Sequence, residues 1–174
     1  MLEFGIPNNK KFKEGFENYK NNNKIDNNYK GNYVFRNGKK YMFYSTIFFL
    51  LILIVSIIGI YDLVMVLKKI DYRIVLYLGL FIYGVYGFIK IYTHKITIEN
   101  NNIIYKNQKI NIAYIESATV KIMKISTNKL DRCLVVKYQD KQYIYRLNLD
   151  NVYKFLNIIN CYIGNKFSIE VLND

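Results

Sequence analysis

The chain has a single histidine among its 174 residues and only two cysteines, Cys133 and Cys161, which stand 28 positions apart. This spacing fits none of the clustered Cys and His patterns that hold metal ions. The one histidine, His94, lies between the second apolar stretch and the first alternating segment, and with one histidine so placed no Ser-His-Asp or Cys-His set can be proposed. The HExxH, P-loop and GxGxxG signatures are absent as well. We therefore expect a protein that is not an enzyme and that has no metal ion and no cofactor.

Charge is nearly missing from two long apolar stretches in the middle of the chain. Residues 42–67 carry one charged side chain, Asp62, and residues 74–89 carry none. The hydrocarbon core of a bilayer is about 30 Å thick, and a helix needs about 20 mainly apolar residues to cross it. We therefore predict a transmembrane hairpin over residues 42–93, with spans at about 42–67 and 72–92 and a tight connection between them.

Positive charge is distributed unevenly around this hairpin. Near the predicted spans the two tails contain nine cationic side chains, whereas the connection contains three. The nine are Lys24, Lys30, Arg36, Lys39, Lys40, Lys90, Lys95, Lys106 and Lys109, and the three are Lys68, Lys69 and Arg73. Because segments rich in Lys and Arg tend to stay in the cytoplasm, we expect a multi-pass protein with both termini cytoplasmic.

The first 41 residues form a polar N-terminal tail, rich in Asn and Lys and without an apolar period over residues 1–30. So little apolar surface does not offset the entropy of ordering, and we expect a mostly mobile tail. Tyr33-Val34-Phe35 indicates either a short strand before a turn or the frayed first turn of the first span.

After Thr93 the apolar pattern changes from a helical period to strict alternation, which is typical of half-buried strands. Alternating segments occur near residues 96–99, 103–106, 109–112, 117–122, 133–138 and 143–147, and again at 167–171. About five or six short strands at such spacing indicate a small antiparallel sheet or barrel.

A helical period returns near residue 150. Five apolar side chains then fall on one helical face, at Val152, Phe155, Leu156, Ile159 and Tyr162. Asp150 is suited to cap the N-terminus of this helix, and Gly164 to the left-handed position after its end. We predict a helix over about residues 150–163 that docks on the sheet, within a β domain that covers residues 94–174.

This order of elements resembles bacterial membrane proteins in which a two-helix hairpin precedes a pleckstrin-homology-like domain. The matching sequence runs from Lys95 to about Gly164 and includes Ile96-Thr97-Ile98-Glu99-Asn100 and the lead into Ile115-Glu116-Ser117. The resemblance implies an α+β membrane protein, with a transmembrane hairpin and a small antiparallel β domain capped by a C-terminal helix. It also implies the bacterial inner membrane as the location, with the β domain in the cytoplasm.

The lipid-binding pattern found elsewhere in that superfamily is incomplete in this chain. Phosphoinositide-binding members carry several Lys and Arg residues around their first β hairpin. Here the region contains Lys106 and Lys109, and Asn111 stands where an Arg would be needed. The sequence therefore does not support phosphoinositide recognition.

Two sets of charged residues remain as candidate functional sites. Asp62 lies inside a predicted span, where ionisable groups are often functional, but its place near the end of the run also fits interfacial solvation, pairing with a loop cation or helix packing. Four cations surround a predicted polar loop at 126–131, at Lys121, Lys124, Lys129 and Arg132. Contact with anionic lipid headgroups is one interpretation of this group, and a solvated basic face is the simpler one. Aromatic residues interleaved with Arg are missing there, so we expect no nucleic acid partner.

We expect an integral membrane protein whose hairpin anchors a cytoplasmic module in the lipid bilayer. The module would bind a protein partner or a second copy of the chain, and the sequence identifies no small-molecule substrate. Because small proteins of similar architecture serve as immunity proteins, immunity to a bacteriocin or toxin is a more specific hypothesis. The alternative is a small transporter or channel subunit that works through the hairpin and Asp62.

Overall fold

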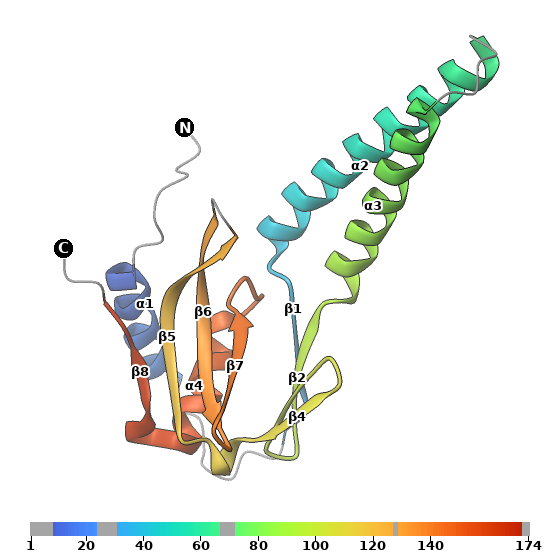
Figure 1. The fold of residues 1–174 in the computed structure, drawn as a ribbon. Coiled ribbons are helices and arrows are strands. Elements are labelled where there is room, and N and C mark those ends of the chain that lie inside the picture. Colours follow the sequence, from blue (N-terminus) through green and yellow to red (C-terminus); the bar gives the residue numbers. More distant parts are fainter. Residues whose placement is uncertain (1–8, 24–30, 67–71, 127–128, 172–174) are drawn as a thin grey trace. The chain divides into compact units, whose positions relative to one another are not determined.

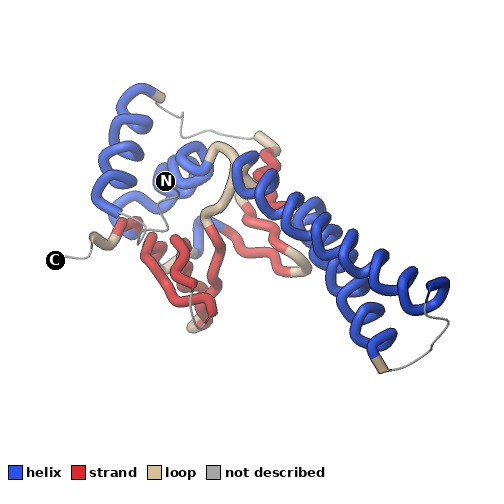
Figure 2. The backbone as a smooth tube through the Cα atoms, turned by 90° about the horizontal axis from the view of Figure 1, so that it is seen from above, coloured by secondary structure: helices blue, strands red, loops and turns tan. Residues whose placement is uncertain are grey.

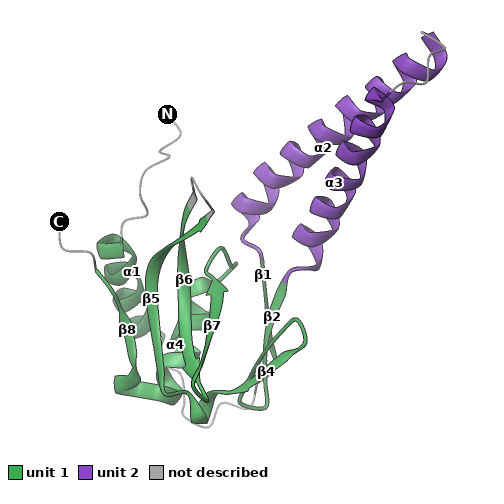
Figure 3. Cartoon of the chain, in the orientation of Figure 1, with its two compact units in different colours: residues 1–36, 95–174 green, residues 37–94 purple. Residues whose placement is uncertain are grey.

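The computed structural model describes residues 9–23, 31–66, 72–126 and 129–171. Within them the chain is α+β, as predicted, with four α-helices and two four-stranded sheets (Figure 1). The chain divides into two compact units (Figure 3). Unit 1 consists of residues 1–36 and 95–174, and unit 2 consists of residues 37–94.

Unit 2 is a pair of long apolar helices that lie side by side in opposite directions (Figures 1 and 2). Helix α2 covers Lys39–Tyr61 and continues as a π-helical segment over Asp62–Val66, and α3 covers Arg73–Thr93. Both helices are long and apolar enough to cross a membrane. The helices predicted from the two apolar stretches are confirmed, and the connection at 67–71 lies outside the described residues.

Small side chains allow α2 and α3 to pack closely. Gly84 and Gly87 are both buried, and a Cβ atom at either would collide with side chains of α2, Leu53 in the first case and Phe49 in the second. At the ends of the two helices, the buried amide of Asn37 donates a hydrogen bond to the carbonyl of Ile91 over 2.8 Å. Unit 2 is therefore a packed helical hairpin, and not two independent segments.

Unit 1 contains two sheets. The first is an antiparallel sheet in the order β1-β2-β3-β4, formed by Tyr33–Arg36, Lys95–Glu99, Asn102–Tyr105 and Gln108–Asn111. The second has the order β7-β6-β5-β8, formed by Lys141–Arg146, Lys129–Tyr138, Ser117–Ser126 and Phe167–Ile169. Strand β8 lies parallel to β5, so the prediction of one small antiparallel sheet or barrel is correct for most strand pairs but not for this one.

The helical hairpin is inserted between two strands that pair with each other. Strand β1 precedes unit 2 in the chain and β2 follows it, and the two are antiparallel with Arg36 opposite Lys95. The interpretation of residues 33–35 as a strand therefore holds. The structure differs from the predicted β domain of residues 94–174, because residues before the hairpin belong to the same unit.

The N-terminal tail contains a helix where a mostly mobile chain was predicted. Helix α1 covers Asn9–Asn22 and buries Phe12 and Phe16 one turn apart. Phe12 lies against Tyr153 of helix α4 (Val152–Ile163), with 5.1 Å between the ring centroids, and Phe16 lies against Phe167 at 5.4 Å. The tail has few apolar residues, but these share one helical face, and their burial against unit 1 stabilises the helix.

Helix α4 covers Val152–Ile163, two residues shorter at its start than predicted, and supplies much of the core of unit 1. Asp150 does not cap it: Asn151 is the N-cap residue, and the Asp150 N–H donates to the Arg36 carbonyl. Gly164 is the C-cap residue and has a positive φ of 52°, but its ψ of −119° lies outside the left-handed helical conformation that was predicted. Helices α1 and α4 lie on the same side of the β7-β6-β5-β8 sheet (Figure 2), and the residues from Phe155 to Ile159 are all buried.

Candidate binding cleft beside strand β7

The four cations predicted to surround one loop do not share one face in the structure. Lys121 and Lys124 both lie on β5, but three positions apart, so their side chains point to opposite faces of the sheet. Lys129 begins β6, and its side chain lies outside the described part of the chain. Contact between these residues and lipid headgroups stays a prediction, but they do not form a one-sided patch.

Arg132, the fourth of these cations, contacts helix α1. Its guanidinium lies over the ring of Phe12, 4.0 Å from the centroid, and its Nε donates to Asn9 Oδ1 over 2.8 Å. Burial lowers the pKa of Arg132 from its ordinary value. These contacts tie the N-terminal helix to β6, so the side chain stabilises unit 1.

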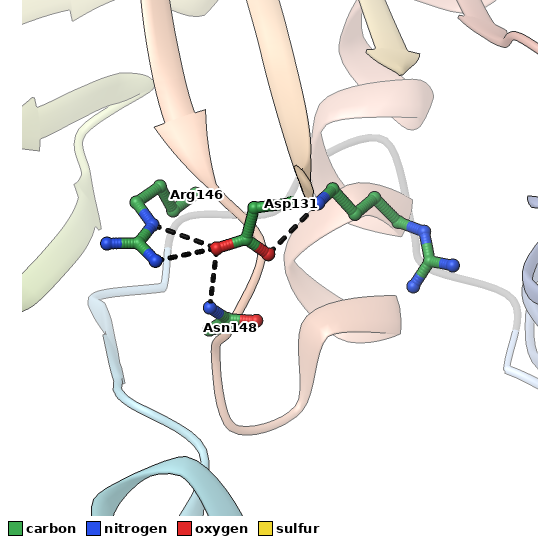
Figure 4. Close-up of polar contacts among 4 residues, drawn as sticks. Asp131, Arg146 and Asn148 are labelled. Atoms are coloured by element: carbon green, nitrogen blue, oxygen red, sulfur yellow. Dashed lines mark hydrogen bonds and ion pairs between the residues drawn. The ribbon is translucent and has the colours of Figure 1, made fainter. Parts of the chain in front are cut away.

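Asp131, the last residue of the predicted loop at 126–131, belongs to strand β6 in the structure. Its carboxylate is buried. Arg146 donates to Asp131 Oδ2 through Nε at 3.0 Å and through a terminal nitrogen at 2.6 Å, and Asn148 donates to the same oxygen at 2.9 Å (Figure 4). The other oxygen, Oδ1, accepts the backbone N–H of Arg132. Both carboxylate oxygens are engaged, so Asp131 links β6 to β7 and to the following loop.

Asp62, the other predicted site residue, is exposed at the end of α2, where the π-helical segment begins. The segment ends four residues later at Val66. A proton or ion pathway through Asp62 stays a prediction.

The two thiols are free, and neither has the surroundings of a nucleophile. Cys133 is fully buried, and burial raises its pKa to about 11; burial also raises the pKa of Cys161. Both are therefore protonated at neutral pH and act as small packing side chains. Among the described residues, no group of three His, Cys, Asp or Glu side chains could hold a metal ion.

A cleft of about 610 Å³ lies between β7 and the tip of the β3–β4 hairpin. We call it the β7 cleft, and it is lined by Tyr105, Lys106, Gln108, Lys141, Gln142, Tyr143, Ile144 and Tyr145. Side chains of a strand alternate between its two faces, so a cleft over one face would be lined by every second residue. Five consecutive residues of β7 line this one, which means that the edge of the strand borders it.

The β7 cleft is basic and rich in hydrogen-bond donors. Lys106 and Lys141 line it together with two glutamines and three tyrosines, and its lining contains no carboxylate. Tyr145 is almost completely buried, and its hydroxyl has no hydrogen-bond partner among the described residues. Burial, with Tyr143 and Tyr105 nearby, raises the pKa of Tyr145, so this hydroxyl is a donor at neutral pH.

These groups are suited to binding a ligand that carries hydrogen-bond acceptors. The donors are ammonium groups, side-chain amides, phenol hydroxyls and the edge of a strand, whereas a paired nucleophile and base are missing from the lining. Sequence reasoning did not find the cleft, although it predicted the strand at 143–147. Which strand ends a sheet depends on pairing between distant segments, and alternation does not reveal it.

Comparisons of the chain with models of known protein families, with curated proteins and with solved structures found no match.

Proposed function

We propose that the protein is a non-catalytic interaction module anchored in the bacterial inner membrane. Unit 2 spans the bilayer twice, and unit 1 is a pleckstrin-homology-like domain in the cytoplasm. This domain binds a protein partner or a second copy of the chain. Immunity to a bacteriocin or toxin is a narrower form of this proposal and rests on the resemblance alone; a toxin gene beside the gene for this chain would favour it.

Apolar exposure supports the membrane anchor. Large apolar side chains are exposed along both helices of unit 2, including Phe43 at 62% and Val75 at 70%. A helix that is apolar on all sides needs an apolar environment, either a large protein core or a bilayer. Each such side chain contributes about 1.5–3 kcal/mol when it leaves water, so many of them together make a bilayer the favoured surroundings.

The pairing of β1 with β2 across the hairpin is the observation that carries the proposal. These strands flank unit 2 in the chain and belong to one sheet, with Arg36 opposite Lys95. A hairpin that starts and ends at neighbouring strands must return to the side of the membrane from which it left. The excess of cations outside the connection then favours the cytoplasm for that side.

The order of elements in unit 1 supports the pleckstrin-homology-like assignment. Four strands form one antiparallel meander, three more form a second, and a helix follows that packs into the core. In the chain the hairpin follows β1 and precedes β2, so the backbone passes from the domain into the anchor and back again. We therefore describe the anchor as an insertion into the domain.

Labelling of single cysteines tests the topology. In a chain with Cys133 and Cys161 changed to Ala, we expect Tyr72→Cys to react with an impermeant maleimide in intact spheroplasts. Asn22→Cys and Asn165→Cys, which are exposed positions of unit 1, should react only after the membrane is permeabilised. Reaction of Asn22→Cys without Asn165→Cys, or the reverse, would contradict the pairing of β1 with β2; reaction of both in intact spheroplasts would place unit 1 outside the cell.

Substitution of Asp62 distinguishes a hairpin that only anchors the protein from one that conducts a proton or an ion. Asp62→Asn keeps the volume of the side chain and removes its charge. Because Asp62 is exposed at the end of α2, we expect unchanged insertion and an unchanged cellular phenotype. Western blots of membrane fractions and growth of the complemented deletion strain measure these. Loss of the phenotype at normal membrane levels would support the transporter alternative.

A further inference from the structure

We propose that the β7 cleft binds an extended, acidic segment of a partner protein, which adds to the free edge of β7 as a further strand. The carboxylates of that segment lie at Lys106 and Lys141. This inference rests on the proposed function, because it identifies the partner class and the binding surface of the cytoplasmic module.

The edge of β7 is available for pairing. Strand β7 stands at the end of its sheet, with β6 on one side and the cleft on the other. An edge strand offers a row of backbone donors and acceptors, and proteins usually protect long edges with proline, a bulge, an inward charge or lysine side chains, which deter partners other than acidic ones. The six residues of β7 contain no proline, and Ile144 is 48% exposed in the middle of the strand. Such an edge is the usual acceptor of an added strand.

The charge of the cleft selects an acidic segment. Lys106 and Lys141 line the cleft without a carboxylate, and Asp140, in the turn before β7, is exposed but is not part of the lining. Lys106 is held at the tip of the β3–β4 hairpin by a positive φ of 54°, with its Nζ 5.3 Å from the centroid of the Tyr105 ring. Carboxylates of an added segment would pair with these two ammonium groups.

A second copy of the chain fits this edge poorly. Strand β7 begins with Lys141, ends with Arg146 and has no acidic residue. A second β7 strand would therefore bring further cationic side chains to the cleft and no carboxylate for Lys106 or Lys141. The net charge of +12 on each chain adds to the repulsion.

Peptide binding to the full-length protein in a zwitterionic detergent tests the inference. The probe is a fluorescein-labelled peptide of alternating Glu and Val, long enough to pair with all six residues of β7. The comparison peptide has Gln in place of Glu. Fluorescence anisotropy should show binding of the Glu peptide, with the Gln peptide weaker by about tenfold. Amide hydrogen exchange should slow in residues 141–146 when the Glu peptide binds.

Charge reversal in the cleft provides the decisive variant. Lys106→Glu/Lys141→Glu should weaken binding of the Glu peptide by about tenfold or more. The control is Lys124→Glu/Lys137→Glu, an identical change of charge at exposed lysines outside the lining, which should alter binding by less than about twofold. Slow amide hydrogen exchange in the strands other than β7 would show that both variants are folded.

Three results would overturn the inference: no binding of the Glu peptide, an equal loss in the control variant, or no protection of β7. Binding of the protein to vesicles with anionic headgroups tests lipid as the alternative ligand. If these bind the protein through Lys106 and Lys141 while the peptide does not, the cleft is a lipid site. The peptide and vesicle measurements are independent of the cysteine labelling in spheroplasts. The proposed topology can therefore be correct even if the β7 cleft does not bind an acidic segment.

Discussion

Phe155→Asp should unfold unit 1, with a loss comparable to the whole free energy of folding. The Phe155 side chain is completely buried at the centre of the core and meets the ring of Phe35 edge to face, with 5.1 Å between centroids. Removing a buried Phe costs about 3–5 kcal/mol through lost contacts and a cavity. An unpaired carboxylate at the same place adds a further penalty. The stability of a domain is only about 5–15 kcal/mol, so little would remain.

Thermal denaturation in detergent, followed by circular dichroism of the β-rich signal, measures this effect. The matched control is Tyr114→Asp, which introduces the same charge at an aromatic residue that is 71% exposed. Lys154, although it neighbours Phe155, is unsuitable as a control because its Nζ lies 4.5 Å from the centroid of the Tyr33 ring. Equal losses in the two variants would mean that α4 packs on the sheets through another face.

A chain of residues 95–174 alone should fail to fold, whereas residues 1–36 joined to residues 95–174 through an Asn-Gly turn should fold as a soluble protein. Segments before the hairpin contribute three core aromatics, Phe12, Phe16 and Phe35. Each contributes about 1.5–3 kcal/mol on burial, and together they match much of the stability of a small domain. Without them β2 also loses its partner β1.

A short turn can make this connection because Arg36 and Lys95 are opposite each other in the β1–β2 ladder. An Asn-Gly pair between them would form a two-residue hairpin turn in place of unit 2. We expect a monomer with cooperative thermal unfolding, measured by size-exclusion chromatography and circular dichroism. Cooperative folding of residues 95–174 alone would show that the N-terminal segments are dispensable, contrary to the structure.

The periodic segments of unit 1 were predictable because their patterns are strong and local. Strands β2, β3, β5, β6 and β7 and helix α4 all lie within a few residues of the predicted ranges. Alternation of apolar and polar residues defines a strand without reference to its partner. The long apolar helices of unit 2 were predictable for the same reason, since length and composition suffice.

Helix α1 was missed because its signal is weak. Phe12, Phe16 and Tyr19 have helical spacing, but the residues between them are mostly Lys, Asn and Glu. A segment with this composition does not form a stable helix by itself. Contacts with Tyr153 and Phe167, more than 130 positions later in the chain, stabilise it.

The four cations around residues 126–131 are close in sequence but do not share one surface of the structure. Four cations within twelve positions indicated one surface, yet Lys121 and Lys124 face opposite sides of β5, and Arg132 packs on α1. Strand direction and the position of α1 decided these orientations. The β7 cleft combines residues 105–108 with residues 141–145, and neither segment alone marks a site.

Local sequence patterns specify the elements of this protein: two apolar helices, a series of short strands and a late amphipathic helix. Each is defined by a period or by a run of one residue type, and both are local properties. Three further features come from the fold: the hairpin is inserted between paired strands, the N-terminal tail completes the core, and the edge of β7 lies beside two lysines. These features depend on contacts between residues far apart in the chain, whose free energies no local pattern encodes.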